Sequence, residues 1–273
     1  MTRFSECFLL VFGQLAVGGM IALAVPPFAM LERGFYKSSA GVFVGFGVLY
    51  LAGAVALAVR VGSPGSGQIV RLVLWGAFVA LSAAYLATLW GDSGPRRART
   101  FLASLAFGLA ALCASATAYR PGPLLSLTTL VYPVGFVASA LVLGAVAVGM
   151  LLGHWYLIDL GLSIEPLRRL LNYFVGVLLL QLVAGVLVVG ALALTKGPGA
   201  AAVITLWHDH GTLLALRVLL GPAAALVMAF MIHRTLLIPQ TMAATGLFYV
   251  ATLAVMMGEI LGRLVLFRTS LPL

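Results

Sequence analysis

The chain has 273 residues, of which 63% are hydrophobic and 8% are charged, whereas a soluble domain is usually about one quarter charged. This composition leaves no polar coat for a water-facing surface and excludes a soluble globular domain. The formal net charge is +9, but the basic residues stand singly or in pairs at the ends of apolar runs, which is typical of membrane flanks. A nucleic-acid partner is not expected, because the sequence has no basic arm or aromatic-interleaved patch.

The apolar runs are continuous and long, which favours transmembrane helices over the alternating segments of a β-barrel. Runs that can cross about 30 Å of hydrocarbon stand at 6–30, 40–61, 69–90, 99–119, 124–157, 167–194, 211–233 and 238–267. The sequence therefore predicts an all-α, polytopic integral membrane protein of eight transmembrane helices in a single domain, 1–273. Its approximate halves, 1–120 and 124–273, can each form a four-helix bundle.

An even number of spans places both termini on one side of the membrane, here called the terminal side, and the loops after the odd-numbered spans on the far side. The first run is interpreted as a retained helix, because Pro26-Pro27 and Glu32-Arg33 follow it in place of a small-residue cleavage site. Lys and Arg are balanced between the two sides, so their distribution does not decide the orientation.

Two pairs of glycines have the spacing at which helices pack closely in lipid. They are Gly41 and Gly45 in the second span, and Gly258 and Gly262 in the eighth. Ordinary helix packing is the role expected for both pairs.

Several polar residues enter the bilayer from the terminal side, where buried ionisable groups are costly and indicate function. Glu259 lies about 12 Å inside the eighth span, with Arg263 one turn away on the same face. The other polar residues on this side are Arg217 and His210, at the seventh span, and Gln14 and Glu6, in the first span. We expect these side chains to share a pocket at the terminal-side end of the bundle.

Such a pocket offers what a quinone requires: hydrogen-bond donors for its carbonyl oxygens and an acid or base for its protons. In this interpretation Glu259 and His210 exchange protons, Arg217 and Arg263 tune the charge, and Gln14 hydrogen-bonds the ring. The alternative is a purely structural ion pair that makes the helix insertable, with the arginine of the seventh span reaching the interface.

A second group of polar residues lies on the far side. His154 lies near the end of the fifth span, and His233 lies at the end of the seventh. Two histidines from different helices at one depth can ligate the iron of a haem b. Beside Trp155, Tyr156 and Arg234, the same histidines also match an interfacial belt that needs no cofactor.

The segment from Trp207 to His210 resembles a metal patch, but its histidines at i and i+2 do not share a helix face. We expect it to cap the seventh span, with Asp209 and Thr212 in or near the first turn. The sequence has no zinc spacing, phosphate-binding glycine loop or catalytic triad, so no metal site and no soluble-type active site are predicted.

Two stretches resemble a known family. Residues 12–19, FGQLAVGG, and residues 258–263, GEILGR, with an apolar-aromatic end at Phe267, resemble the membrane anchor subunit of the dimethyl sulfoxide reductase family. They also resemble the wider group of polysulfide-reductase-type and nitrite-reductase-type quinol-interacting subunits. Span count and length agree over the whole chain, whereas the residue match covers the first and last helices. The segment 154–169 is not part of the family pattern.

The resemblance implies a haem-free anchor in the bacterial inner membrane that binds menaquinol or ubiquinol. Such an anchor exchanges electrons with a separate iron-sulfur subunit, which serves a molybdenum-type catalytic subunit. Carried over to this chain, Gln14 belongs to the first-helix motif, and Glu259 and Arg263 belong to the last. The expected function is a quinone-reactive subunit of a respiratory oxidoreductase complex; the alternatives are a b-type cytochrome and a non-redox transporter or scaffold.

Overall fold

The computed structural model describes residues 2–62, 65–119, 128–159, 161–194, 198–238 and 240–272. No residue in these ranges is in a β-strand, and eight helices in them are long and apolar enough to cross a membrane. The prediction of an all-α fold with eight spans is confirmed. The chain is a multi-pass membrane protein whose exposed apolar side chains contact lipid.

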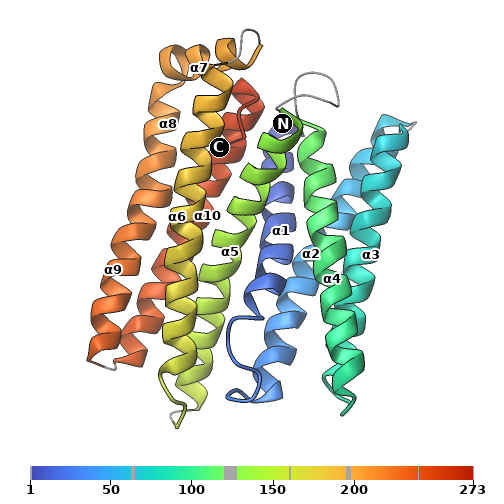
Figure 1. Ribbon diagram of the computed structural model, residues 1–273. Coiled ribbons are helices and arrows are strands. Elements are labelled where there is room, and N and C mark those ends of the chain that lie inside the picture. The colour runs from blue at the N-terminus through green and yellow to red at the C-terminus, as the bar shows by residue number, and fades with distance from the viewer. Residues whose placement is uncertain are drawn as a thin grey trace.

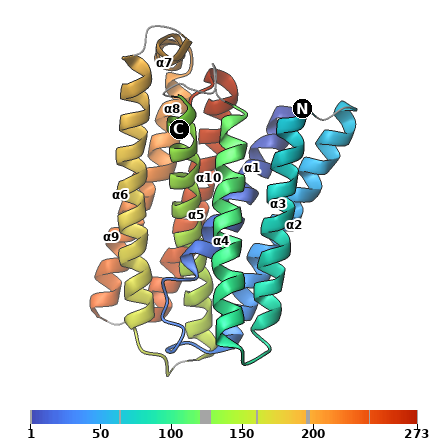
Figure 2. The same cartoon turned by 45° about the vertical axis from the view of Figure 1, so that its right-hand side comes forward.

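The helices follow the chain as a sequence of antiparallel rods (Figures 1 and 2). Their bounds are α1 (Thr2–Ala22), α2 (Arg33–Val61), α3 (Ser66–Thr88), α4 (Gly94–Thr117), α5 (Thr128–Ile158), α6 (Glu165–Ala193), α7 (Pro198–Asp209), α8 (Gly211–Val218), a π-helical turn η1 (Leu219–Ala223), α9 (Ala224–Leu237) and α10 (Thr241–Thr269). The seventh span is the continuous unit α8–η1–α9. As predicted, the two termini lie toward the same end of the bundle.

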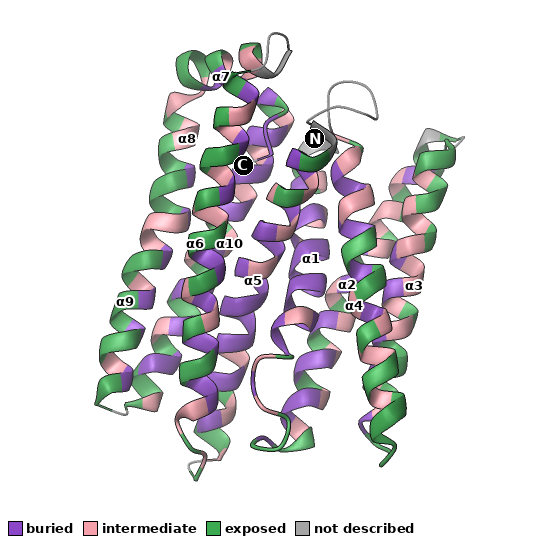
Figure 3. Ribbon diagram, viewed as in Figure 1, coloured by how far each residue is buried: buried purple, intermediate pink, exposed green. Residues whose placement is uncertain are grey.

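The buried centre of the bundle is formed by α1, α5 and α10. In the most apolar 18-residue stretch of each of these helices, 61%, 67% and 50% of the residues are buried, whereas the corresponding share is 22% for α2 and for α3. Figure 3 shows the same division, with buried positions concentrated on the central helices and exposed positions on the outer ones. The outer helices therefore present most of their surface to lipid.

The two halves of the chain meet along a close contact between α1 and α5. A Cβ added at Gly18 would lie 1.7 Å from the carbonyl oxygen of Ala140, and one added at Gly144 would lie 2.0 Å from the backbone of Gly18. Only glycine permits this approach, because any side chain would overlap the opposing backbone. The first four spans pack on one side of this contact and the last four on the other.

The first span is shorter than predicted. The expected range was 6–30, but α1 ends at Ala22 and residues 23–32 form turns. Pro26 and Pro27 explain the difference, because proline lacks the N–H that a continuing helix needs and disfavours helix at the preceding residue. The freed carbonyl of Pro26 instead accepts a hydrogen bond of 2.8 Å from the hydroxyl of Tyr36.

The predicted cap of the seventh span is confirmed in part: His210 is its N-cap residue and Thr212 lies in its first turn, whereas the place predicted for Asp209 is wrong. Asp209 is the last residue of a separate helix, α7, which lies across the terminal-side end of the bundle (Figures 1 and 2). The N-cap residue of α8 is His210, whose side chain makes no capping hydrogen bond. The helix α7 was not predicted, because its apolar sequence is too short for a span, but the predicted start of the seventh span at residue 211 is confirmed.

The structure tests the helix-packing role predicted for the two glycine pairs, and the result differs between them. A Cβ added at Gly41 or Gly45 meets no described atom within 4 Å, so the packing role expected for that pair is wrong. A Cβ added at Gly258 would lie 2.3 Å from the Cα of Gly221. The packing role is therefore confirmed for Gly258, which brings α10 against the π-helical turn.

Replacement of Gly18 by alanine is expected to destabilise the α1–α5 contact by about 1–3 kcal/mol, because the added methyl group forces the backbones apart. The measurement is the temperature of thermal unfolding in detergent. Gly45→Ala is the matched control, since its added methyl group enters open space. An equal effect of the two substitutions would show that the α1–α5 contact does not require glycine at position 18.

Candidate functional site

A buried carboxylate between two arginines lies at the centre of the second half of the chain. Glu259 and Arg263 are completely buried and Arg217 is 7% exposed. The Oε1 atom of Glu259 lies 2.8 Å from Nη2 of Arg217, and its Oε2 atom lies 3.3 Å from Nη2 of Arg263. The three residues that the sequence placed in one pocket are therefore in direct contact.

Two uncharged polar side chains complete this cluster. Nε2 of Gln181 donates to Oε1 of Glu259 at 2.6 Å, and Nη2 of Arg263 donates to Oγ of Ser139 at 2.8 Å. Because these residues come from α5, α6, α8 and α10, the network joins four helices. We call the set Ser139, Gln181, Arg217, Glu259 and Arg263 the charge cluster.

The local sequence explains how α8 and α10 bring their charges together. Glu259 and Arg263 are one helical turn apart on α10, so they share a face. Arg217 comes directly before the π-helical turn, which contains Pro222, a residue that removes one helical hydrogen bond. The contact between Gly221 and Gly258 lies beside the Arg217 guanidinium, which is 2.5 Å from a Cβ added at Gly221. Small residues thus make room for the buried ion pair.

The charge cluster carries one more positive than negative group, since two guanidiniums face one carboxylate. Nε and Nη1 of Arg263 have no hydrogen-bond partner among the described residues. The guanidinium instead lies over the ring of Phe136, with 4.6 Å from its central carbon to the ring centroid, a cation–π contact. The cluster is therefore suited to an electron-rich or anionic group.

An apolar cavity of about 520 Å³ adjoins the charge cluster. It lies between α5, α6, α7 and α8, and its polar lining includes Ser139, Gln181 and Arg217. Val186 and Trp207 on its wall are 73% and 65% exposed, so in a membrane the cavity opens toward lipid. A narrower void shares Gln181 and Arg217 with the cavity and also contacts Glu259.

Gln14 and His210 do not join the charge cluster directly. Nε2 of Gln14 donates to the carbonyl oxygen of Phe136 at 3.1 Å. Phe136 is also the residue whose ring lies under the Arg263 guanidinium. His210 lies at the junction of α7 and α8. Neither side chain is among the described residues that line the cavity. Glu6 lines a different pocket, in the first half of the chain. Of the six residues predicted to share a pocket, the structure brings together Arg217, Glu259 and Arg263.

The two predicted haem ligands are both exposed, at the far-side ends of α5 and α9. Nδ1 of His154 lies 3.2 Å from the hydroxyl of Tyr249, so one ring nitrogen is already engaged. His233 also faces outward. Nearby, Arg169 pairs with Glu165 at 2.7 Å, and Arg168 donates to the carbonyl oxygen of Leu236. These contacts are typical of an interfacial belt.

The sequence interpretation did not include Gln181 and Ser139. Gln181 is the single amide between Phe174 and Ala193 of α6, and its isolation in the apolar part of a membrane span is a signal that could have identified it. Ser139 has no comparable signal, because small hydroxyl residues are common in transmembrane helices and usually bond within their own helix.

Comparisons of the chain with protein-family models, with curated proteins and with solved structures find no match. The described residues contain no group of three or more His, Cys, Asp or Glu side chains that could hold a metal ion. Within the site, the available chemistry is hydrogen-bond donation by guanidinium, amide and hydroxyl groups, and proton exchange at one carboxylate.

The Glu259→Gln variant is expected to lower the free energy of unfolding by about 3–5 kcal/mol, because it leaves two guanidiniums buried without a counter-charge. The temperature of thermal unfolding in detergent measures the effect. The control is Glu165→Gln, which removes an ion pair whose side chains are 47% and 53% exposed and should cost no more than about 1 kcal/mol. Similar losses in the two variants would refute the structural importance of the buried carboxylate.

Proposed function

We propose that this protein is the membrane subunit of a respiratory oxidoreductase complex in a bacterial inner membrane, and that it binds a quinone or quinol in the cavity beside the charge cluster. The observation that carries the proposal is an apolar, lipid-facing cavity whose inner wall presents Arg217 and Gln181, with Glu259 directly behind them. Menaquinone and ubiquinone share the chemistry that such a site would recognise.

The shape and lining of the cavity support a lipid-soluble ligand with a polar head. Its volume of about 520 Å³ lies within the roughly 300–1,000 Å³ typical of small-molecule sites. An isoprenoid chain can leave between α6 and α8 toward the bilayer, past exposed side chains such as Val186. The Arg217 guanidinium then faces the ring and can donate hydrogen bonds to its oxygens. The Gln181 amide donates to Glu259 and Ser139, so its oxygen can accept a hydrogen bond from a quinol hydroxyl.

Oxidation of a quinol to a quinone releases two protons and two electrons. Among the described residues that line the cavity there is no carboxylate and no histidine. Glu259, one hydrogen bond behind Arg217 and Gln181, would therefore accept the two protons one after the other and release the first before it takes the second. The electrons pass to an extramembrane iron-sulfur subunit, the type of partner that the resemblance of the first and last helices implies.

Filling the cavity is expected to abolish quinol oxidation without unfolding the protein. The variant is Gly185→Phe, since Gly185 lines the cavity and a Cβ added there meets no described atom within 4 Å. In the purified complex, quinol oxidation should fall at least about tenfold, the loss expected when a binding contact worth about 1.4 kcal/mol is removed. Activity with an artificial electron donor should remain.

The matched control for this experiment is Gly176→Phe. Gly176 lies on the same helix and also has open space around an added Cβ, but it does not line the cavity. Loss of quinol oxidation in both variants, or loss of both activities in Gly185→Phe, would argue against quinone binding in this cavity.

Purification in mild detergent is expected to yield the protein together with an iron-sulfur subunit, detected by mass spectrometry and by iron content. A reduced-minus-oxidised spectrum of the isolated membrane subunit should lack a haem signal. A b-type haem band that disappears in His154→Gln would instead support the cytochrome alternative. Purification without any redox partner would favour a transporter or scaffold.

A further inference from the structure

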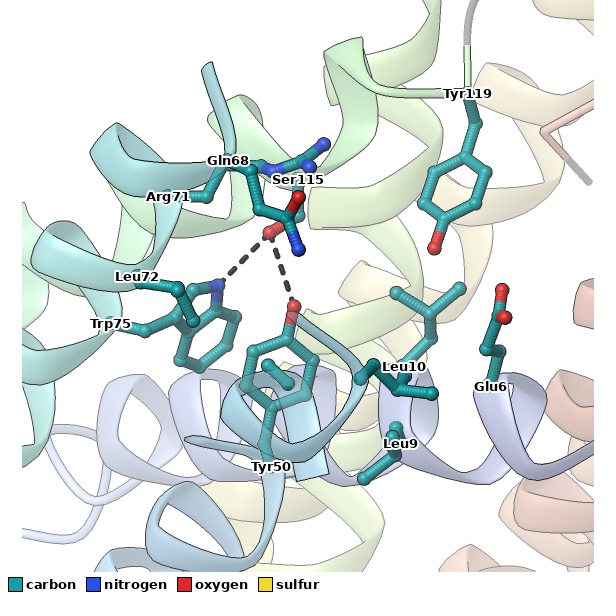
Figure 4. Close-up of a pocket in the computed structure, with 12 residues that line it drawn as sticks. Glu6, Leu9, Leu10, Tyr50, Gln68, Arg71, Leu72, Trp75, Ser115 and Tyr119 are labelled. Atoms are coloured by element: carbon teal, nitrogen blue, oxygen red, sulfur yellow. Dashed lines mark hydrogen bonds between the residues drawn. The ribbon is translucent and has the colours of Figure 1, made fainter. Parts of the chain in front are cut away.

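A second pocket lies in the first half of the chain, at the terminal-side end of α1, α2, α3 and α4. Its volume is about 130 Å³, which suits a small polar group and is below the roughly 300–1,000 Å³ of sites for larger ligands. Figure 4 shows its labelled residues, which come from all four helices and from the turn after α4. None of these residues belongs to the charge cluster.

Aromatic side chains form the deep wall of this pocket. Nε1 of Trp75 donates to Oγ of Ser115 at 2.9 Å, and the hydroxyl of Tyr50 lies 3.4 Å from the same oxygen (Figure 4). The Tyr50 and Trp75 rings are in contact, with centroids 4.0 Å apart. Both residues are buried, so the wall is a fixed surface of aromatic rings.

Three further polar side chains of this pocket have no partner among the described residues. Glu6, Gln68 and Arg71 line the pocket and make no hydrogen bond or ion pair with any described residue. In Figure 4, Arg71 and Gln68 lie on one side of the pocket, and Glu6 and Tyr119 lie on the other. Burial raises the pKa of the Tyr119 hydroxyl, so it remains a donor at neutral pH. The pocket therefore separates a cation from an anion, neither of which has an ionic partner among the described residues.

The depth of these groups matches the headgroup layer of a bilayer. Arg71 is five residues from the start of α3 and Glu6 is four from the start of α1, which places both roughly 6–8 Å below the helix ends. The headgroup region occupies about 5–8 Å on each side of the hydrocarbon core. Leu9, Leu57 and Leu72 also line the pocket and offer an apolar surface toward the bilayer.

We propose that this pocket binds a zwitterionic group that carries a phosphate and an ammonium, as in phosphatidylethanolamine or free phosphoethanolamine. Arg71 and Gln68 would hold the phosphate, since guanidinium and amide groups donate to its oxygens. Glu6 and the ring of Tyr50, which lies between Glu6 and Trp75 in Figure 4, would hold the ammonium by charge and cation–π attraction. The proposal is independent of quinone binding, because the two sites share no residue.

The experiment titrates delipidated protein in detergent with phosphatidylethanolamine and with phosphatidylglycerol of the same acyl chains, and counts bound lipid by native mass spectrometry. Arg71→Gln should weaken binding of both lipids about tenfold, the effect of losing a charge-assisted hydrogen bond. Glu6→Gln should remove the preference for phosphatidylethanolamine and leave phosphatidylglycerol binding unchanged or stronger. Gln68→Leu, at a half-buried position without a described partner, gives a second test of the phosphate side.

The control is Arg268→Gln, which removes an exposed terminal-side arginine that does not line the pocket. A loss as large as that of Arg71→Gln would show general surface attraction and overturn the proposal. Equal affinity of the wild-type protein for the two lipids, or a preference that Glu6→Gln leaves intact, would overturn it as well.

The source of the group is decided by adding O-phosphoethanolamine to the same variants. If the free compound alone binds with the same dependence on Arg71 and Glu6, the ligand is a soluble zwitterion. If it neither binds nor competes, while phosphatidylethanolamine does bind with that dependence, the ligand is a lipid. Either result supports the recognition chemistry, whereas binding of neither compound above the Arg71→Gln level refutes it.

Discussion

The second half of this protein is organised around the carboxylate of Glu259. Two guanidiniums that face each other in a low-dielectric interior repel strongly, and an unpaired charge in a membrane span costs about 2.5–3.5 kcal/mol even on insertion scales. The carboxylate bonds to Arg217 at 2.8 Å and to Arg263 at 3.3 Å, which draws the seventh span onto α10. The contact of Gly221 with Gly258 and the π-helical turn are the backbone adjustments that this pairing requires.

The same pairing determines where a ligand could bind. Arg217 is held at the inner wall of the apolar cavity by its bond to Glu259, and Gln181 is oriented by the same carboxylate. Both side chains are therefore fixed before any ligand arrives, which reduces the entropic cost of binding. The cavity itself lies on the lipid-facing side, between helices that are less buried than the central α1, α5 and α10. A rigid centre and an accessible flank are compatible with a ligand that enters from the membrane.

The two pockets differ in how their charges are compensated, and depth explains the difference. In the charge cluster, deep in the bundle, every charged residue has an ionic partner. In the pocket of the first half, near the interface, Glu6 and Arg71 have no ion pair with the described residues. Unpaired charges are tolerated there because headgroups and water are close, whereas the interior permits only paired ones. The shallow pocket is thus suited to a ligand with separate charges, and the deep cavity to an apolar ligand with an electron-rich head.

The sequence by itself determined the eight spans, the common side of the termini and the meeting of Arg217, Glu259 and Arg263 inside the bundle. Continuous apolar runs and isolated buried charges are local signals that survive in a single sequence. The end of α1 and the existence of the helix α7 were not predicted, because short apolar segments beside a span have no distinct pattern of their own. The tertiary structure alone decided that Gln14 bonds to Phe136 while Gln181 reaches Glu259. The reason is that helix rotation and neighbour choice, set by close contacts such as Gly18 on Ala140, fix which amide faces the carboxylate.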